Sequence, residues 1–358
     1  MKKSNIVIPT YNRPRYLKRL LQYYQSDAQN YTFIIADSSI PKNREKNTHV
    51  IKEFSDYDII SPQPYPTDMN MFYKLADALT YAQAKYCVIC ADDDFITPLG
   101  ITQSVAFLQS HPEYSCAHGD YISFFPQKTP AGKSQFYWKP GYQYSSITSS
   151  NPEERLSYHL SHYEVATFYA VHPTSLIQLF FKEITNYTDT ENDGQFGELL
   201  PSMLTLIYGK MKKLDGMLYC AREAIPTSAG RTSKKLANFV SDGTYDSKYS
   251  RFKSCLSTHL QQKSSLTRKQ AERIIDKAWG HYTKHYHGFI TPKLSYLMNK
   301  APLSPQINEK MRRTYRKAIR KKTSSPHQDI WEVTETPPQT YGDEFTKITE
   351  ITLSSDTR

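Results

Sequence analysis

The fold is decided by a stretch that reads Lys85-Tyr86-Cys87-Val88-Ile89-Cys90-Ala91-Asp92-Asp93-Asp94-Phe95-Ile96-Thr97-Pro98. Its apolar run from Tyr86 to Ala91 predicts a buried strand, which stops abruptly at three successive aspartates. Because unpaired ionised carboxylates are costly to bury, we expect them at a sheet edge that faces water, a divalent cation or a ligand with compensating donors. In open α/β sheets, ligands bind outside the carboxyl ends of the strands. The alternative is a solvated acidic turn.

The N-terminal segment repeats this arrangement. Asn5 to Pro9 predicts a short strand that ends in the polar turn Thr10 to Pro14. Apolar residues at helical spacing follow, namely Leu17, Leu20, Leu21 and Tyr24. A second apolar run, Tyr31 to Ala36, ends at Asp37. Together these segments predict a βαβ unit with parallel strands.

The remaining elements follow the same α/β pattern as far as about residue 225. We expect a weak strand at 58–61, helices at 71–84 and 100–109, strands at 114–125, 166–172 and 214–221, and helices that begin after Asn151 and near Phe196. The segment 126–150 is rich in Gly, Ser, Pro and Tyr, which predicts a mobile loop near the site.

The C-terminal third differs in composition. Beyond about Pro226 the chain becomes polar, Lys-rich and helical, and from Thr323 onward Ser, Thr, Pro and acidic residues dominate. We therefore divide the chain into an α/β domain at 1–225, a helical region at 226–322 and a disordered acidic tail at 323–358.

Composition limits the classes of protein to consider. The chain has 358 residues, 39% of them hydrophobic, with no apolar run of 18 residues, which predicts a cytoplasmic, unsecreted protein. The five cysteines are few and scattered. Cys87 and Cys90 form a lone CxxC within the predicted strand, and we interpret them as core thiols.

The net charge of +10 is concentrated in one segment. Residues 308–322 contain eight Lys or Arg and one Glu, whereas residues 323–358 contain two basic and seven acidic residues. A single basic segment argues against a nucleic-acid-binding fold, although that class stays open as a non-enzymatic alternative. The predicted helix 304–322 either packs its narrow apolar stripe on the domain or lies on an anionic membrane surface.

Three segments together resemble the family 2 glycosyltransferases of the GT-A fold. They are Ile6 to Arg13 with the Leu-rich helix that follows, Ile34 to Ser39, and Val88 to Asp94. The resemblance covers about residues 1–225. It implies a metal-dependent enzyme that moves a sugar from a nucleotide-diphosphate donor to an acceptor hydroxyl, with inversion. The implied acceptor is a glycan or a lipid-linked molecule of surface polysaccharide biosynthesis.

The resemblance also implies a set of donor-binding residues. The base and ribose would be held by Pro9, Thr10, Tyr11 and Asp37, and Arg13 and Asp93 would belong to the same donor site. Asp92 and Asp94 would match the Asp-X-Asp motif that binds ribose and a Mn²⁺ or Mg²⁺ ion. Lys74 either occupies the position of a basic residue near the diphosphate or is a solvated helix lysine.

The general base is expected on the acceptor side. Glu198 stands eleven residues before Gly209, which matches the family's spacing, and Asp193 is its rival. A second enzymatic alternative is nucleotidyl transfer to a sugar phosphate. Enzymes of that kind usually carry a Gly-rich loop after the first strand, and Thr10 to Pro14 contains no glycine.

Overall fold

The computed structural model describes most of the chain. It covers residues 4–67, 69–128, 132, 134–142, 145–164, 166–187, 193–224, 236–287 and 337–355. The predicted basic helix 304–322 lies outside these residues. Within them, each helix is too short or too polar to cross a membrane.

The first sheet has five strands in the order β3-β2-β1-β4-β8. Strands β1 (Ser4–Thr10), β2 (Tyr31–Asp37), β3 (Ile59–Ile60) and β4 (Tyr86–Ile89) are parallel, and only β8 (His172–Pro173) is antiparallel. The predicted parallel βαβ unit is therefore confirmed, with α1 (Pro14–Tyr23) as its connecting helix. The register pairs Thr10 with Asp37, so the two polar turns after β1 and β2 begin side by side.

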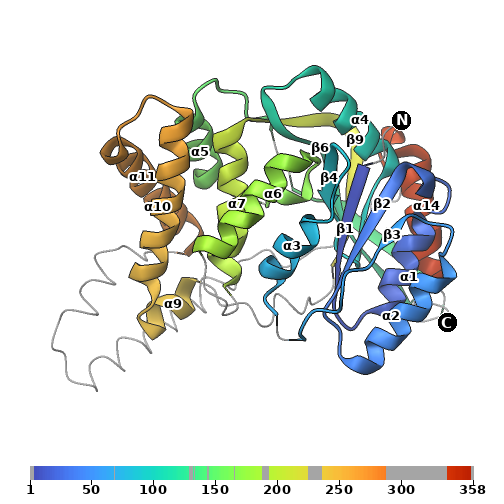
Figure 1. Cartoon of the computed structure of the whole chain (residues 1–358). Coiled ribbons are helices and arrows are strands. Elements are labelled where there is room, and N and C mark those ends of the chain that lie inside the picture. The colour runs from blue at the N-terminus through green and yellow to red at the C-terminus, as the bar shows by residue number, and fades with distance from the viewer. Residues whose placement is uncertain are drawn as a thin grey trace.

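Both faces of this sheet are buried, as expected for a parallel sheet. Val7, Ile34 and Ile89 face a core that contains α3 (Met71–Leu79), α6 (Thr174–Tyr187) and α7 (Gly194–Tyr208). Their neighbours Ile6, Ile8 and Phe33 face a second core with α1 and α2 (Pro41–Glu53). Figure 1 shows the sheet between these two layers of helices. The predicted α/β class, a mostly parallel sheet flanked by helices, is confirmed.

A second sheet carries the chain past the aspartates. Its order is β5-β9-β6-β7, and its strands are β5 (Asp94–Ile96), β6 (Tyr114–Lys128), β7 (Ser134–Pro140) and β9 (Lys210–Glu223). Helix α4 (Pro98–Ser110) connects β5 to β6. The expected mobile loop at 126–150 is wrong in part, because β7 pairs with β6 over seven residue pairs from Ile122–Pro140 to Lys128–Ser134. Stacked rings, Phe124 on Phe136 and Phe125 on Tyr137, stabilise this hairpin.

The middle of the chain supplies helices. Helix α5 (Pro152–Ser161) begins after Asn151 as predicted, but the Asn151 side chain donates to Glu154 and caps no backbone N–H group. The strand expected at 166–172 is largely wrong, because Thr167–Tyr169 forms a 3-10 turn, η2, and only His172 begins β8.

The helical C-terminal region packs onto the α/β layer. It contains α9 (Leu236–Asp242), α10 (Tyr245–Lys263) and α11 (Arg268–His287). Residues of these helices, among them Phe252 and Trp279, join the core that also holds Phe196 of α7. The hydrophobic core continues across the domain boundary expected near residue 225. That boundary stays a prediction.

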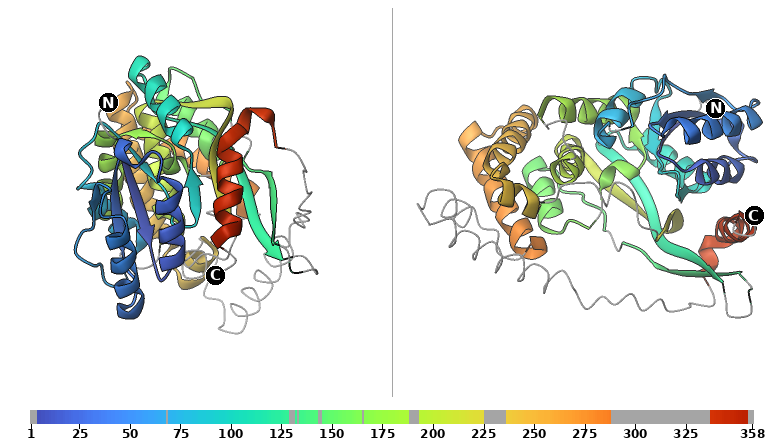
Figure 2. Two further views of the ribbon diagram at one scale, coloured as in Figure 1. Left: turned by 90° about the vertical axis from the view of Figure 1, so that its right-hand side faces the viewer. Right: turned by 90° about the horizontal axis from the view of Figure 1, so that it is seen from below.

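The C-terminal tail contains a helix that was not predicted from the sequence. Residues 339–341 form a 3-10 turn, η3 (Gln339–Tyr341), and α14 runs from Gly342 to Ser355. Phe345 and Ile348 are buried in the second core, and Figure 2 shows α14 beside the β6–β7 hairpin. The expected disordered tail is wrong for these residues. Residues 323–336 and 356–358 lie outside the described part.

Candidate functional site

The three aspartates occupy the turn between β4 and β5. Asp92, Asp93 and Asp94 are only 4%, 4% and 5% exposed, so the solvated acidic turn is excluded. Ionised carboxylates at this depth require charged or hydrogen-bonding partners. The turn after β1 and the distant strand β9 supply them.

The turn after β1 binds the first two aspartates. Thr10 Oγ1 donates to Asp92 Oδ2 over 2.6 Å, and Arg13 Nη1 lies 2.6 Å from Asp93 Oδ2 and 3.3 Å from Asp92 Oδ1. Thr10 and Arg13 belong to the predicted donor site, and the structure brings them to the aspartates. Pro9 and Tyr11 belong to the same turn and are partly exposed.

Arg222 faces the third aspartate from β9. The antiparallel register of β5 and β9 pairs Asp94 with Arg222 directly. Arg222 Nε lies 3.4 Å from Asp94 Oδ2, and the Glu223 backbone N–H donates to Asp94 Oδ1 over 3.3 Å. The sequence analysis did not assign Arg222 to the site. The available signal was a charged pair, Arg222 and Glu223, directly after a predicted strand.

Tyr142 shows that part of the segment 126–150 does lie at the site. Its ring lies under the Arg222 guanidinium, with 5.6 Å from Arg222 Cζ to the ring centroid, and its hydroxyl is 3.0 Å from Arg222 Nη1. The expectation that this segment approaches the site is thus supported at one residue.

A buried ion pair between Arg19 and Glu223 lies next to the aspartate turn. Arg19 Nη2 lies 2.5 Å from Glu223 Oε2 and also donates to the Asp93 carbonyl over 3.2 Å. Both side chains are almost fully buried. Because removal of one partner would leave a buried charge, this pair fixes α1, β9 and the aspartate turn relative to one another.

Asp92 and Asp94 resist ionisation. Burial, reinforced by the charge of Asp93, raises the pKa of Asp92 to about 7, and burial likewise raises the pKa of Asp94 to about 7. A divalent cation would favour the ionised forms. The contacts of Asp94 are longer than the usual 2.9 Å or so, which leaves this carboxylate the more available of the two.

The aspartates supply carboxylate oxygens, the type of ligand that a hard cation takes. In the described residues, the one group of three acidic, His or Cys side chains whose ligand atoms lie within 4.8 Å of one another is elsewhere in the fold. The aspartates therefore offer at most two carboxylates to one point. Mg²⁺ is commonly bound by one or two carboxylates together with substrate phosphates and water.

The turns after β1 and β2 are locked together by polar contacts. Asn12 has φ of 60°, a left-handed conformation that asparagine tolerates better than most residues. Its side-chain oxygen accepts from Ile40 N, and its backbone N–H donates to Ser39 Oγ over 2.7 Å. Asp37 accepts from Ser39 N and Asn47 Nδ2. Asp37 thus lies at the predicted edge, with both oxygens bonded within the protein.

Lys74 is not a solvated helix lysine. Its side chain is buried, and Nζ donates to the Thr10 carbonyl over 3.1 Å and to Ser38 Oγ over 2.9 Å. Burial lowers the pKa of Lys74 to about 8, against the opposing charges of Asp92 and Asp37. Lys74 therefore joins the two turns from beneath, on the α3 side.

The two candidate bases differ in their surroundings. Asp193 is the N-cap of α7, where it accepts from Phe196 N over 3.0 Å, and Lys248 Nζ lies 3.4 Å from its other oxygen. Glu198, one turn further along, is half-buried and accepts from the Tyr163 hydroxyl over 2.8 Å. Asp193 is therefore committed to structure, whereas Glu198 retains access to solvent.

Tyr169 is within electrostatic range of both Glu198 and the aspartates. Burial raises the pKa of Tyr169, the charge of Arg222 opposes this effect, and the charges of Asp94 and Glu198 add to it. The Arg222 guanidinium lies 5.4 Å from its ring centroid. Glu198 and Asp94, more than a hundred residues apart in sequence, thus share one neighbourhood.

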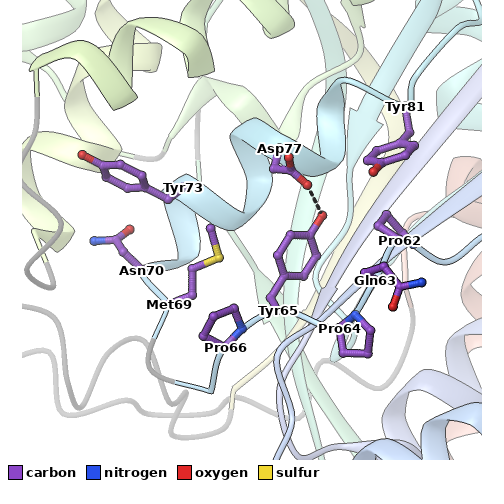
Figure 3. Close-up of a pocket in the computed structure, with 10 residues that line it drawn as sticks. All are labelled: Pro62, Gln63, Pro64, Tyr65, Pro66, Met69, Asn70, Tyr73, Asp77 and Tyr81. Carbon is purple, nitrogen blue, oxygen red and sulfur yellow. Dashed lines mark hydrogen bonds between the residues drawn. The ribbon is translucent and has the colours of Figure 1, made fainter.

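A cavity of about 630 Å³ opens on the outer side of α3. Figure 3 shows its ten lining residues, which are Pro62, Gln63, Pro64, Tyr65, Pro66, Met69, Asn70, Tyr73, Asp77 and Tyr81. None of them is a predicted site residue. The cavity adjoins the β2 turn through Tyr65, whose backbone N–H donates to the Asp37 carbonyl over 3.1 Å and whose hydroxyl donates to Asp77 over 2.7 Å.

Comparison with known proteins yields solved structures only. No family model and no curated protein matches the sequence. A crystal structure of Staphylococcus aureus TarS residues 1–349 in complex with UDP-GlcNAc matches with a TM-score of 0.53 and 12% identity, covering 99% of this chain and 90% of that one. A second crystal structure of the same fragment matches with a TM-score of 0.51, 12% identity and the same coverage.

A longer TarS structure matches with a TM-score of 0.50 and 12% identity, covering 86% of this chain. This chain spans 47% of the length of that longer structure. At 12% identity the likeness shows the fold alone. The predicted GT-A-type α/β fold is confirmed by the match to TarS.

Proposed function

We propose that this protein is a glycosyltransferase that moves a sugar from a nucleoside-diphosphate donor to an acceptor hydroxyl. The observation that carries the proposal is the group of buried aspartates at the carboxyl end of β4, between Arg13 and Arg222. The fold is also that of TarS, a glycosyltransferase, whose fragment was crystallised with UDP-GlcNAc. A UDP-sugar is therefore the first donor to test.

The donor site in this proposal uses the two locked turns and the aspartate edge. Pro9, Thr10, Tyr11 and Asp37 border the nucleoside, with Lys74 fixing the turns from beneath. Asp94, with Asp92, holds Mn²⁺ or Mg²⁺, and Arg13 and Asp93 complete the site. A bound divalent cation would neutralise charge on the donor diphosphate and on the leaving nucleotide.

Glu198 is the general base in this proposal. A base must combine access to the acceptor with a position near the donor. Glu198 is half-buried, shares the Tyr169 neighbourhood with Asp94, and is oriented by the Tyr163 hydroxyl. As the acceptor hydroxyl attacks, Glu198 takes its proton, the new glycosidic bond forms, and the bond to the nucleotide breaks with inversion.

The proposal extends to the acceptor and its location. A glycan or a lipid-linked acceptor of surface polysaccharide biosynthesis fits the expected chemistry, and residues 304–322 would contact an anionic membrane at its cytoplasmic face. Those residues lie outside the described part of the chain, so their support comes from sequence: eight basic residues between 308 and 322.

The test is a donor-consumption assay on the full chain with UDP-GlcNAc, other UDP-sugars and Mn²⁺, with UDP release as the readout. We expect Glu198→Gln to lower transfer by about 10²- to 10⁴-fold while UDP binding persists. Asp193→Asn is the matched control: asparagine is an equally good N-cap, so the variant should keep turnover within about tenfold, and circular dichroism checks that it stays folded without the negative charge beside Lys248.

Two outcomes would contradict the proposal. If Asp193→Asn abolishes transfer and Glu198→Gln does not, the base is Asp193. If no nucleotide sugar is consumed, but a nucleoside triphosphate and a sugar phosphate yield pyrophosphate, the reaction is nucleotidyl transfer.

A further inference from the structure

Three side chains with metal-ligating atoms converge far from the aspartate edge. They are Glu183 of α6 and Cys255 and His259 of α10, and one ligand atom of each lies within 4.8 Å of the other two. Cys255 and His259 are one helical turn apart, so they point to the same side of α10. Cys255 and His259 are buried and Glu183 is largely so.

The spacing is close to that of a bound zinc ion. His259 Nε2 lies 3.6 Å from Glu183 Oε2, and Cys255 Sγ lies 3.9 Å from the same oxygen. Ligands of a tetrahedral Zn²⁺ at 2.0–2.3 Å are separated by about 3.3–3.6 Å. The two distances to Glu183 are thus within a few tenths of an ångström of those values, and the Cys255 and His259 ligand atoms lie within 4.8 Å of each other.

The other nitrogen of the histidine is already held. Tyr208 of α7 places its hydroxyl 2.8 Å from His259 Nδ1. This contact orients the imidazole so that Nε2 faces Glu183 and Cys255. Metal-bound histidines usually have such a partner on the second ring nitrogen, and it fixes the orientation of the ring.

Charge balance favours a divalent cation at this position. A carboxylate, a thiolate and a neutral imidazole around Zn²⁺ give a neutral unit, which is the least costly form for a buried site. Lys263 lies against the Tyr208 ring, with Nζ 4.4 Å from the ring centroid. This nearby positive charge disfavours a site with a net positive charge.

We propose that Glu183, Cys255 and His259 bind one zinc ion that joins α6 to α10, with a fourth position open to water. The site would connect the α/β layer to the C-terminal helices across the boundary expected near residue 225. Because Cys255 must lose its proton to the solvent as the metal binds, zinc binding releases protons and strengthens as the pH rises. This inference does not rest on the proposed glycosyl transfer.

The test measures zinc in the full chain. Protein stripped with a chelator is dialysed against Zn²⁺, and bound metal is determined by elemental analysis. We expect one zinc per wild-type chain, loss of it in Cys255→Ser and His259→Ala, and retention in Cys116→Ser, which removes a buried thiol outside the cluster. Circular dichroism of each variant shows whether it is folded.

Two further measurements separate this site from the aspartates. Cobalt should give a thiolate charge-transfer band in the wild type and in Asp94→Asn, but not in Cys255→Ser. Tyr208→Phe keeps the ring and removes the hydroxyl, and it should weaken zinc binding about tenfold.

Three results would overturn the inference. They are a wild-type chain without stoichiometric zinc, full zinc in a folded Cys255→Ser variant, and loss of zinc in Asp94→Asn with retention in Cys255→Ser. Unchanged affinity in Tyr208→Phe would contradict the role given to Tyr208.

Discussion

Arg13 and Arg222 explain how three adjacent carboxylates remain folded inside the protein. Arg13 comes from the turn directly after β1, and its part in the site was predicted from the sequence. Arg222 is separated from Asp94 by 128 residues, and only the pairing of β5 with β9 brings the two together. The apolar run before them predicted where the acids lie, and the family resemblance implied that Thr10 and Arg13 belong to the same site. Arg222 depends on a strand register that a single sequence does not reveal.

Lys74 and Asp193 show the same limit. For Lys74, the sequence left open a basic residue near the diphosphate or a solvated helix lysine, and the packing of α3 under the two turns excludes the solvated position. For Asp193, the structure adds a role as the N-cap of α7 and a contact with Lys248 that the sequence did not reveal. Burial and hydrogen bonding, which sequence does not give, distinguish these roles.

Stability should depend on pH through the aspartates. The folded-state pKa of Asp94 is raised from an ordinary value near 4 to about 7. Between these values the native state holds a proton that the unfolded state has lost. The free energy of unfolding therefore falls as the pH rises from about 4 to about 7.

Asp94→Asn should remove the part of this loss of stability that is caused by ionisation of Asp94. In a metal-free buffer, we expect the variant to exceed the wild type in stability by on the order of 2 kcal/mol at pH 8, and by much less at pH 5. Urea unfolding at the two pH values measures the difference. Asp56→Asn, at an exposed position, should show no such trend, and an equal difference for Asp94→Asn at both pH values would refute the effect.

At the scale of elements, prediction worked where periodicity was strong. The parallel strands and α1 have long apolar runs or regular helical spacing. Helix α14 was missed because Thr, Ser and acidic residues dominate its composition, while its buried face is narrow: Phe345, Ile348 and Thr352. The β6–β7 hairpin was missed because the Gly, Ser, Pro and Tyr content of residues 126–150 favoured a loop, although the rings of Phe124, Phe136 and Trp138 alternate with polar residues and fill one face.

Helix α14 should contribute to the stability of the whole α/β layer. Phe345 packs edge-to-face on Trp138, with ring centroids 5.2 Å apart, and Glu344 accepts from the Tyr23 hydroxyl of α1. We expect Phe345→Ala to lower the free energy of unfolding by about 3 kcal/mol. Thr346→Ala, at the exposed neighbouring position, is the control. Equal stability of the two variants in urea titrations would mean that α14 is dispensable.

At the scale of the molecule, two cores share one sheet. Helices α3, α6 and α7 contribute to the core on one face, where α10 and α11 pack against α6 and α7, and α1, α2, α4 and α14 contribute to the core on the other. The fold class followed from the first hundred residues, because the order strand, turn, helix, strand, acid is specific. How the C-terminal helices dock was not predicted, since their apolar stripes fit many partners.

The central claim is that the aspartate edge binds a nucleoside diphosphate with a divalent cation. Calorimetric titration of UDP into the full chain, with and without Mn²⁺, tests it most directly on the wild type, Asp94→Asn and the exposed control Asp56→Asn. We predict saturable binding with Mn²⁺ in the wild type and the control, and affinity lower by about tenfold or more without Mn²⁺ or in Asp94→Asn. Equal affinity of Asp94→Asn and wild type in Mn²⁺, or no binding of UDP by the wild type, would contradict the account.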